Sequence, residues 1–185
     1  MNSIVESGER FDRYVLITGQ DYPVISNKEL SQRLSDDTEY MRCYKVTGST
    51  MNIKVRRYYF YNKFLVGTKA KDFIRRIIQF LHRPFSKKDT VIIQGQECNI
   101  FYSSAYFAVT HNMFVELCKK GNSIEYYKYF KTSITSDEMY FATIAANSML
   151  KDKLEINNNI SHNLLDNSAI TYFDYRDRPY SFDRE

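Results

Sequence analysis

The chain has 185 residues, of which 43% are hydrophobic and 26% charged, a composition typical of a globular domain with an apolar core. This composition excludes collagen-like and low-complexity polymers, and the longest apolar run, residues 105–109, is too short to cross a bilayer. The amino terminus lacks the basic and then apolar pattern of a secretory signal. We therefore expect a cytoplasmic protein, or one bound peripherally at the cytoplasmic face of a membrane.

The three cysteines, Cys43, Cys98 and Cys118, form an odd number and contain no CxxC pair. This pattern disfavours both a zinc site and a complete disulfide framework. We expect free thiols, as in proteins of a reducing compartment.

Positive charge is concentrated in one stretch of the chain. The net charge of +4 conceals a basic block, residues 42–88, in which 13 Lys and Arg accompany a single acid and the net charge is +12. The remainder of the chain carries −8. Aromatic residues 58–61 lie inside this block, so its partner could be a nucleic acid, a membrane surface or a phosphorylated ligand. Composition alone does not distinguish these three kinds of partner.

The amino-terminal third predicts a strand, a short helix and a hairpin. Residues 14–18 are mostly apolar and β-branched and predict a buried strand after a weakly amphipathic helical stretch. Ser26, followed three residues later by Glu29, has the pattern of a capping box and predicts a helix to about residue 34. The mixed segment 39–66 predicts a loop and a hairpin.

The remaining elements alternate between helices and strands. Residues 68–81 place apolar side chains at helical spacing with Lys and Arg on the other side, and Pro84 ends the pattern. This alternation predicts a single α/β domain over residues 1–185. The other expected elements are strands at 91–93, 100–102 and 169–173 and helices at 113–120, at 123–130 and from residue 135 onward.

Two pairs of polar residues stand where predicted elements begin or end. Gln20 and Asp21 follow the first strand, where open α/β sheets bind ligands, although an ordinary Gly-Asp-Pro turn also explains them. Asp137 and Glu138 open the strongest helix. Because Glu138 comes three residues after Thr135, it either completes a capping box or serves as a general base toward an attacking hydroxyl.

The last polar segment, residues 174–178, contains Tyr175 among charged residues. Its tyrosine could stack on a sugar or a base and its arginines could meet phosphate, or the segment is a solvated charge cluster. The histidines lack metal-ligand spacing, and the chain has no Asp-x-Asp pair. The nearest substitute, residues 37–39, falls in an expected polar loop, so we expect no bound metal.

Four segments resemble, in order, the sequence blocks of one family, the core-2/I-branching glycosyltransferases, which also include peptide O-xylosyltransferases. FDRYVLITGQDYP (residues 11–23) is similar to the family block FDYxxxLSGQDYP, and YSSAYFAVT (102–110) is similar to GSAYFVVSR. SDEMYFATI (136–144) is similar to PDExxxxTI, and ITYFDY (170–175) is similar to RYIDW. Order and spacing agree, so the resemblance covers most of the chain.

The resemblance implies a GT-A-like fold, with a mixed sheet flanked by helices. It implies inverting transfer of N-acetylglucosamine or xylose from a UDP-sugar, without a metal cofactor. Basic side chains then neutralise the departing diphosphate. By position in the matching blocks, Glu138 is the general base, and Gln20 and Asp21 lie on the donor side.

The same resemblance assigns residues to the acceptor side. Tyr175 stands where the family has a stacking Trp, and Ser103 stands where the family usually has Gly. The smaller ring of Tyr175 implies weaker or differently directed stacking. The acceptor-side residues implied in this way are Tyr175, Asp137, Arg56, Arg57 and Tyr58.

The expected partners are a UDP-sugar, a glycan or glycoconjugate acceptor, and a membrane contacted peripherally, with no nucleic acid. No predicted helix presents the bulky aromatic side that would itself argue for membrane binding. Family members begin with uridine-binding strands and continue past the equivalent of residues 178–180 into a diphosphate-binding segment, so we expect this domain to lack both parts. Two alternatives stay open, an inactive glycan-binding remnant and a nucleic-acid-binding module.

Overall fold

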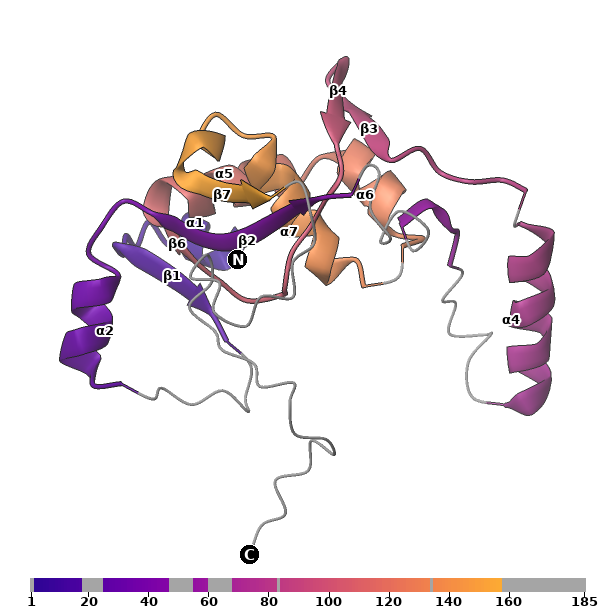
Figure 1. Ribbon diagram of the computed structural model, residues 1–185, viewed down its shortest axis with the longest axis horizontal. Coiled ribbons are helices and arrows are strands. Elements are labelled where there is room, and N and C mark those ends of the chain that lie inside the picture. The colour runs from indigo at the N-terminus through magenta and orange to yellow at the C-terminus, as the bar shows by residue number, and fades with distance from the viewer. Residues whose placement is uncertain are drawn as a thin grey trace, which may run out of the picture.

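The computed structural model describes residues 2–17, 25–46, 55–59, 68–82, 84–133 and 135–157. The helices are α1 (Asn2–Glu6), α2 (Asn27–Arg33), α4 (Lys69–Leu81), α5 (His111–Gly121), α6 (Ile124–Phe130) and α7 (Asp137–Ala146), with a 3-10 turn at Lys151–Lys153. The strands are β1 (Arg13–Leu16), β2 (Glu39–Lys45), β3 (Thr90–Ile93), β4 (Gln96–Asn99), β5 (Phe101–Tyr102), β6 (Phe107–Thr110) and β7 (Leu154–Asn157). Along this part of the chain, helices and strands alternate up to α4, after which four strands, β3 to β6, precede three consecutive helices, α5 to α7 (Figure 1).

The main sheet is mixed. Its strand order is β1-β6-β2-β5 with antiparallel neighbours, and β7 pairs with β2 in parallel. Helices α5 and α7 pack against each other and against this sheet, while β3 and β4 form a separate hairpin. The predicted α/β architecture, a mixed sheet flanked by helices, is confirmed.

The centre of the sheet differs from the sequence prediction. Residues 39–45 form the long strand β2, not part of a local hairpin, and Val55 and Arg56 are helical. Strand β2 pairs with β5, β6 and β7, all more than 50 residues further along the chain. Strand propensity alone could not indicate these distant partners.

Strand β1 is exposed, where the sequence predicted a buried strand. It pairs with β6 and stands at the end of the strand order. Only Tyr14 is buried, stacked on Phe114 with 3.8 Å between ring centroids, while Val15 and Leu16 are exposed. A run of apolar residues therefore marks an edge strand here.

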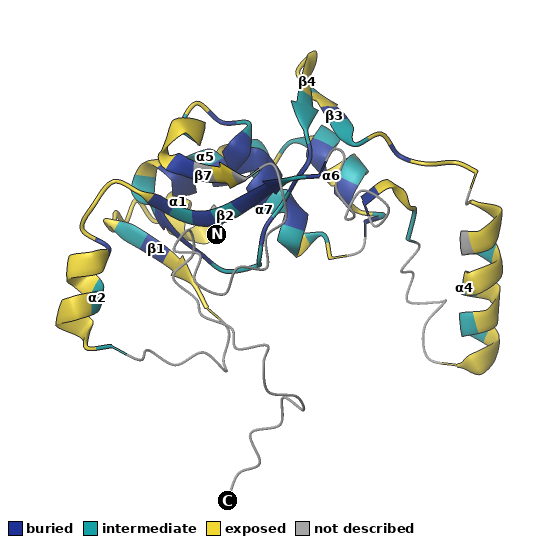
Figure 2. Ribbon diagram, in the orientation of Figure 1, coloured by how far each residue is buried: buried dark blue, intermediate teal, exposed yellow. Residues whose placement is uncertain are grey.

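Side chains cap the helices at their amino termini. Ser26 Oγ accepts a hydrogen bond from the Glu29 backbone N–H, which confirms the predicted start of α2. Thr68 caps α4 in the same way through the N–H of Lys71, and the predicted amphipathic helix is confirmed over Lys69–Leu81. Its apolar side, however, is largely exposed (Figure 2).

The apolar core lies between the sheet and helices α5 and α7, and two of the cysteines belong to it. Cys43 and Cys118 are buried and Cys98 is half-buried, and all three are free thiols, as predicted. Burial raises the pKa of the Cys43 thiol to about 12. Within the described residues, no helix has both the length and the apolar character needed to cross a bilayer.

Candidate functional site

Parts of three of the four family-like segments come together where helix α7 contacts the Phe107 end of strand β6 and the residues just before it. We call this region the α7 joint. Strand β1 pairs with β6 in a register that runs from Arg13 opposite Thr110 to Leu16 opposite Phe107. At the Phe107 end, the ring of Phe107 meets the ring of Phe141 from α7 edge-on, with 5.6 Å between centroids. Three segments far apart in the sequence therefore share one end of the sheet.

Hydrogen bonds fix α7 against strand β5 and against the segment that joins β5 to β6. Thr143 Oγ1 accepts from the Phe101 N–H at 3.1 Å and donates to the Phe101 carbonyl at 3.2 Å. The Ser103 N–H donates to the Glu138 carbonyl at 2.7 Å. These bonds, five residues apart along α7, hold the first turn of the helix beside residue 103.

The predicted capping box at α7 is wrong. The helix begins after Ser136, which makes no side-chain capping bond. Thr135 has a positive φ of 48°, and its backbone carbonyl accepts the Glu138 N–H at 3.0 Å. The Glu138 carboxylate is therefore not used to cap this helix.

Both carboxylates of the α7 first turn are available. Asp137 is exposed and Glu138 is half-buried. Across the described part of the chain, neither carboxylate takes part in a hydrogen bond or an ion pair. A half-buried carboxylate without a committed partner at a helix amino terminus can accept a proton or bind a polar ligand.

A second polar feature lies next to this turn. Ser103 is 2% exposed, and its buried Oγ has no hydrogen-bond partner among the described residues. Buried hydroxyl groups are normally paired, because an unpaired one costs free energy. The α7 joint therefore has a carboxylate without a partner on Glu138 and an unsatisfied hydroxyl group on Ser103, two residues that a backbone hydrogen bond connects.

Sequence reasoning missed Lys87, which is only 5% exposed. Its ammonium group donates to the Ser133 hydroxyl at 2.8 Å and to the Tyr129 carbonyl at 3.2 Å. It also lies 5.3 Å from the centroid of the Tyr58 ring and 5.1 Å from that of Tyr129. Burial lowers the pKa of Lys87 to about 8. Within a highly basic block, no sequence pattern distinguishes this lysine from its exposed neighbours.

The predicted residues Arg56, Arg57 and Tyr58 lie beside the segment that leads into α7. The Tyr59 N–H donates to the Thr132 carbonyl at 2.8 Å, and Tyr58 contacts Lys87 as described. Arg56 is engaged, because its guanidinium donates to the Lys87 carbonyl and the Ser86 hydroxyl. Arg57 is exposed and makes no hydrogen bond or ion pair within the described residues.

Three other predicted site residues, Gln20, Asp21 and Tyr175, lie outside the described residues, as does the strand predicted at 169–173. In the Asp37-Thr38-Glu39 segment, Asp37 and Thr38 lie in an exposed loop as predicted, but Glu39 does not. Glu39 begins β2, is buried, and accepts from the Thr110 N–H at 2.8 Å and the Thr110 hydroxyl at 2.6 Å. Among the residues that the structure describes, no three His, Cys, Asp or Glu side chains gather as a metal site would require.

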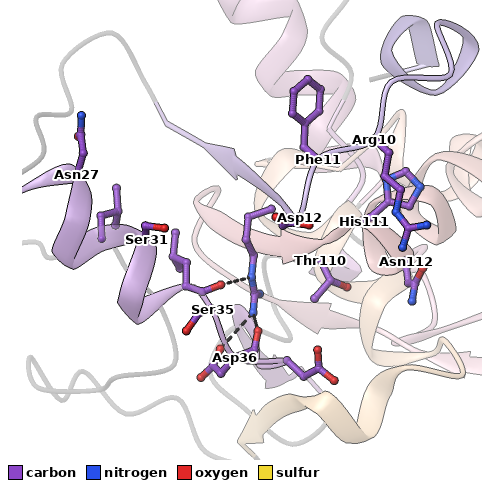
Figure 3. Close-up of a pocket in the computed structure, with 14 residues that line it drawn as sticks. Arg10, Phe11, Asp12, Asn27, Ser31, Ser35, Asp36, Thr110, His111 and Asn112 are labelled. Atoms are coloured by element: carbon purple, nitrogen blue, oxygen red, sulfur yellow. Dashed lines mark hydrogen bonds and ion pairs between the residues drawn. The ribbon is translucent and has the colours of Figure 1, made fainter.

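A separate polar pocket of about 720 Å³ lies at the Arg13 end of β1. Its lining comes from residues 10–13, α2, the loop after α2, and the start of α5 (Figure 3). The Arg13 guanidinium is held by the carbonyls of Leu34, Asp36 and Thr38 and by the Asp36 carboxylate at 3.1 Å. None of the predicted site residues that the structure describes lines this pocket, and the length of β6, about 10 Å, separates it from the α7 joint.

A family model described as Core-2/I-Branching enzyme matches residues 1–182. The chain belongs to this family. No curated protein and no solved structure matches the chain. As a member of the core-2/I-branching family it is of the glycosyltransferase type, whose partners are in general a sugar donor and a glycan acceptor.

Proposed function

We propose that this core-2/I-branching family member transfers N-acetylglucosamine or xylose from a UDP-sugar to a hydroxyl group of a glycan acceptor. The transfer inverts the anomeric centre and uses no metal cofactor, and Glu138 is the general base. The proposal rests chiefly on the Glu138 carboxylate, which is half-buried and free of partners within the described residues, on a residue whose backbone carbonyl accepts the Ser103 N–H.

The chemistry needs one base and one leaving group. Glu138 takes the proton of the acceptor hydroxyl while the hydroxyl oxygen bonds to the anomeric carbon. The bond between that carbon and the diphosphate oxygen breaks on the opposite face, and UDP leaves with the electron pair. Because α7 is fixed by Thr143 and by the Ser103 N–H, the carboxylate is held on a rigid element.

The remaining roles follow from what each side chain can still bind. Arg57 is exposed and uncommitted within the described residues, so we assign it, with Asp137, to the acceptor. Arg56 acts indirectly, because it holds the Lys87 segment in place. Gln20 and Asp21 are proposed donor residues and Tyr175 a proposed acceptor residue, on the family resemblance.

The base assignment is tested by Glu138→Gln, which keeps the size of the side chain and removes its basicity. The full chain is incubated with UDP-N-acetylglucosamine or UDP-xylose and a panel of glycan acceptors, and product and UDP release are measured. We expect kcat to fall by about a hundred-fold or more, because general bases contribute on the order of 10² to 10⁴. Added EDTA should leave turnover unchanged.

Glu125→Gln is the matched control, since Glu125 stands in the first turn of α6 and takes no part in the proposed site. Asp137→Asn should mainly raise the KM for the acceptor. Full activity of a folded Glu138→Gln variant would disprove the base assignment. If EDTA abolished turnover, the metal-free mechanism would be wrong, and failure of both donors would refute the proposed donor class.

A further inference from the structure

Helix α4 divides cleanly into an apolar and a polar half. At 100° per residue, its apolar side chains fall within one arc of about 160° and its polar side chains within the other. The apolar half consists of Ala70, Phe73, Ile74, Ile77, Ile78, Phe80 and Leu81, and the polar half includes Lys69, Lys71, Asp72, Arg75 and Arg76. This pattern is typical of a helix that covers something apolar.

The apolar half of α4 faces solvent. Phe73 is 65% exposed, Phe80 66% and Leu81 63%, and Phe85 just beyond the helix is equally exposed. Part of the polar half, including Lys71 and Arg75, is less exposed than these apolar side chains. Figure 1 shows α4 at one end of the molecule, away from the main sheet, and Figure 2 shows it mostly in the colour of exposed residues.

This arrangement corrects the expectation that no helix presents a bulky aromatic side. Periodicity showed an amphipathic helix but not which side the rest of the protein covers. A helix in a globular protein normally turns its apolar stripe to the core. Two exposed phenylalanines in a row of exposed aliphatic residues form an apolar patch of the kind that marks a binding surface.

We propose that the apolar side of α4 inserts into the surface of a membrane that contains anionic lipids. Cations border the apolar arc on both edges, with Lys69 and Arg76 along one edge and Lys71 along the other. Long basic side chains at these positions reach the phosphate level while their stems stay with the apolar groups. The amphipathic helices that lie in membrane interfaces have this distribution of Lys, Arg, Phe and Leu.

The charge and the length of α4 favour an anionic membrane surface over a second copy of the chain as the partner of its apolar side. The described helix carries four cations and the single acid Asp72, which pairs with Arg75 at 3.1 Å. Two copies packed through this helix would bring like charges together, whereas acidic lipid headgroups neutralise them. With 13 residues the helix is about 20 Å long, which suits an orientation along the membrane surface. This proposal does not depend on the proposed sugar transfer.

Co-sedimentation of the full chain with lipid vesicles tests the proposal. We expect binding to vesicles of phosphatidylcholine with 30% phosphatidylglycerol and much weaker binding to phosphatidylcholine alone. Phe73→Asp combined with Phe80→Asp should weaken binding by about a hundred-fold or more, from the loss of two buried aromatic side chains. Lys69→Gln combined with Arg76→Gln should weaken it by about thirty-fold, since each cation near an anionic surface contributes roughly five-fold.

The control double variant, Ile124→Asp with Met149→Asp, removes two exposed apolar residues away from α4. It should bind vesicles like the unmodified chain, and circular dichroism should show that all variants are folded. The proposal is wrong if the chain fails to bind anionic vesicles, or if the control weakens binding as much as the phenylalanine variant does. It is equally wrong if α4 proves to join two copies of the chain and the dimer does not bind vesicles.

Discussion

Replacing Lys87 with methionine tests how a buried ammonium group makes stability depend on pH. Methionine fills a similar volume without charge. In the folded chain, Lys87 loses its proton at a pKa of about 8, whereas a lysine in an unfolded chain does so near 10.5. Between these values the unfolded chain holds a proton that the folded chain has released. Raising the pH through this window therefore stabilises the fold.

The size of the effect follows from the two pKa values. At about 1.4 kcal/mol for each pH unit, the full difference amounts to about 3 kcal/mol. Between pH 7 and pH 10 we expect the free energy of unfolding of the wild type, relative to Lys87→Met, to increase by about 2.5 kcal/mol. The hydrogen bonds to Ser133 and Tyr129 persist across this range, because a neutral amine still has two N–H groups to donate.

Urea unfolding of both proteins, followed by circular dichroism at several pH values, measures this difference. Other groups change stability in the opposite direction at high pH, because burial raises the pKa of Cys43 and Tyr129 and the unfolded chain deprotonates first. They are present in both proteins, so they cancel in the comparison. Lys88→Met, which removes an exposed neighbouring lysine, controls for the loss of one positive charge.

The free energy of unfolding of the wild type should rise relative to that of Lys87→Met as the pH increases. A difference between the two proteins that stays constant from pH 7 to pH 10 would refute the reasoning. It would mean that the Lys87 ammonium group is solvated in the folded chain and not enclosed by Tyr58 and Tyr129.

Three further substitutions test the hydrogen bonds around the sheet and α7, each by urea unfolding at neutral pH. Glu39→Leu should destabilise by about 3 kcal/mol, because it leaves two half-buried donors of Thr110 without the buried carboxylate that accepts from them; a loss below 1 kcal/mol would contradict this role. Thr143→Val should cost about 2 kcal/mol through both lost bonds to Phe101. Ser103→Ala, which removes an unsatisfied buried hydroxyl, should cost nothing or stabilise slightly, and clear destabilisation would show that this group is bonded.

Local signals in the sequence predicted local structure well. The Ser26 cap, helix α4 and helices α5 and α6 depend on contacts within one or two turns, which residue spacing records directly. The capping box at α7 failed for a local reason too. Thr135 adopts a left-handed backbone conformation there, so its carbonyl, and not its side chain, meets the Glu138 N–H.

Contacts between distant segments could not be predicted from the sequence. The central position of β2 depends on partners that are remote along the chain, and so does the burial of Glu39 against Thr110. The enclosure of Lys87 likewise joins residues 58, 87, 129 and 133. In each case the residues of the segment itself are equally compatible with an exposed position. Only the packing of distant elements against the segment buries it.

The candidate site was predicted in part. The family-like segments pointed to Asp137 and Glu138, and the structure places both on the joint between α7 and the β5–β6 segment. Nothing in the sequence indicated that the Ser103 hydroxyl is buried and unsatisfied, apart from the position itself, where the family usually has Gly. The roles of Gln20, Asp21 and Tyr175 stay predictions from the resemblance.

Because the three thiols are buried to different extents, their reactivity can report when the core of the folded protein opens. A thiol reagent added to the folded chain should modify Cys98, on the β3–β4 hairpin, well before Cys43 and Cys118. The two buried thiols become reactive only when the core around the sheet opens. The rates at which they are alkylated would therefore measure how often the core opens, without any engineered label.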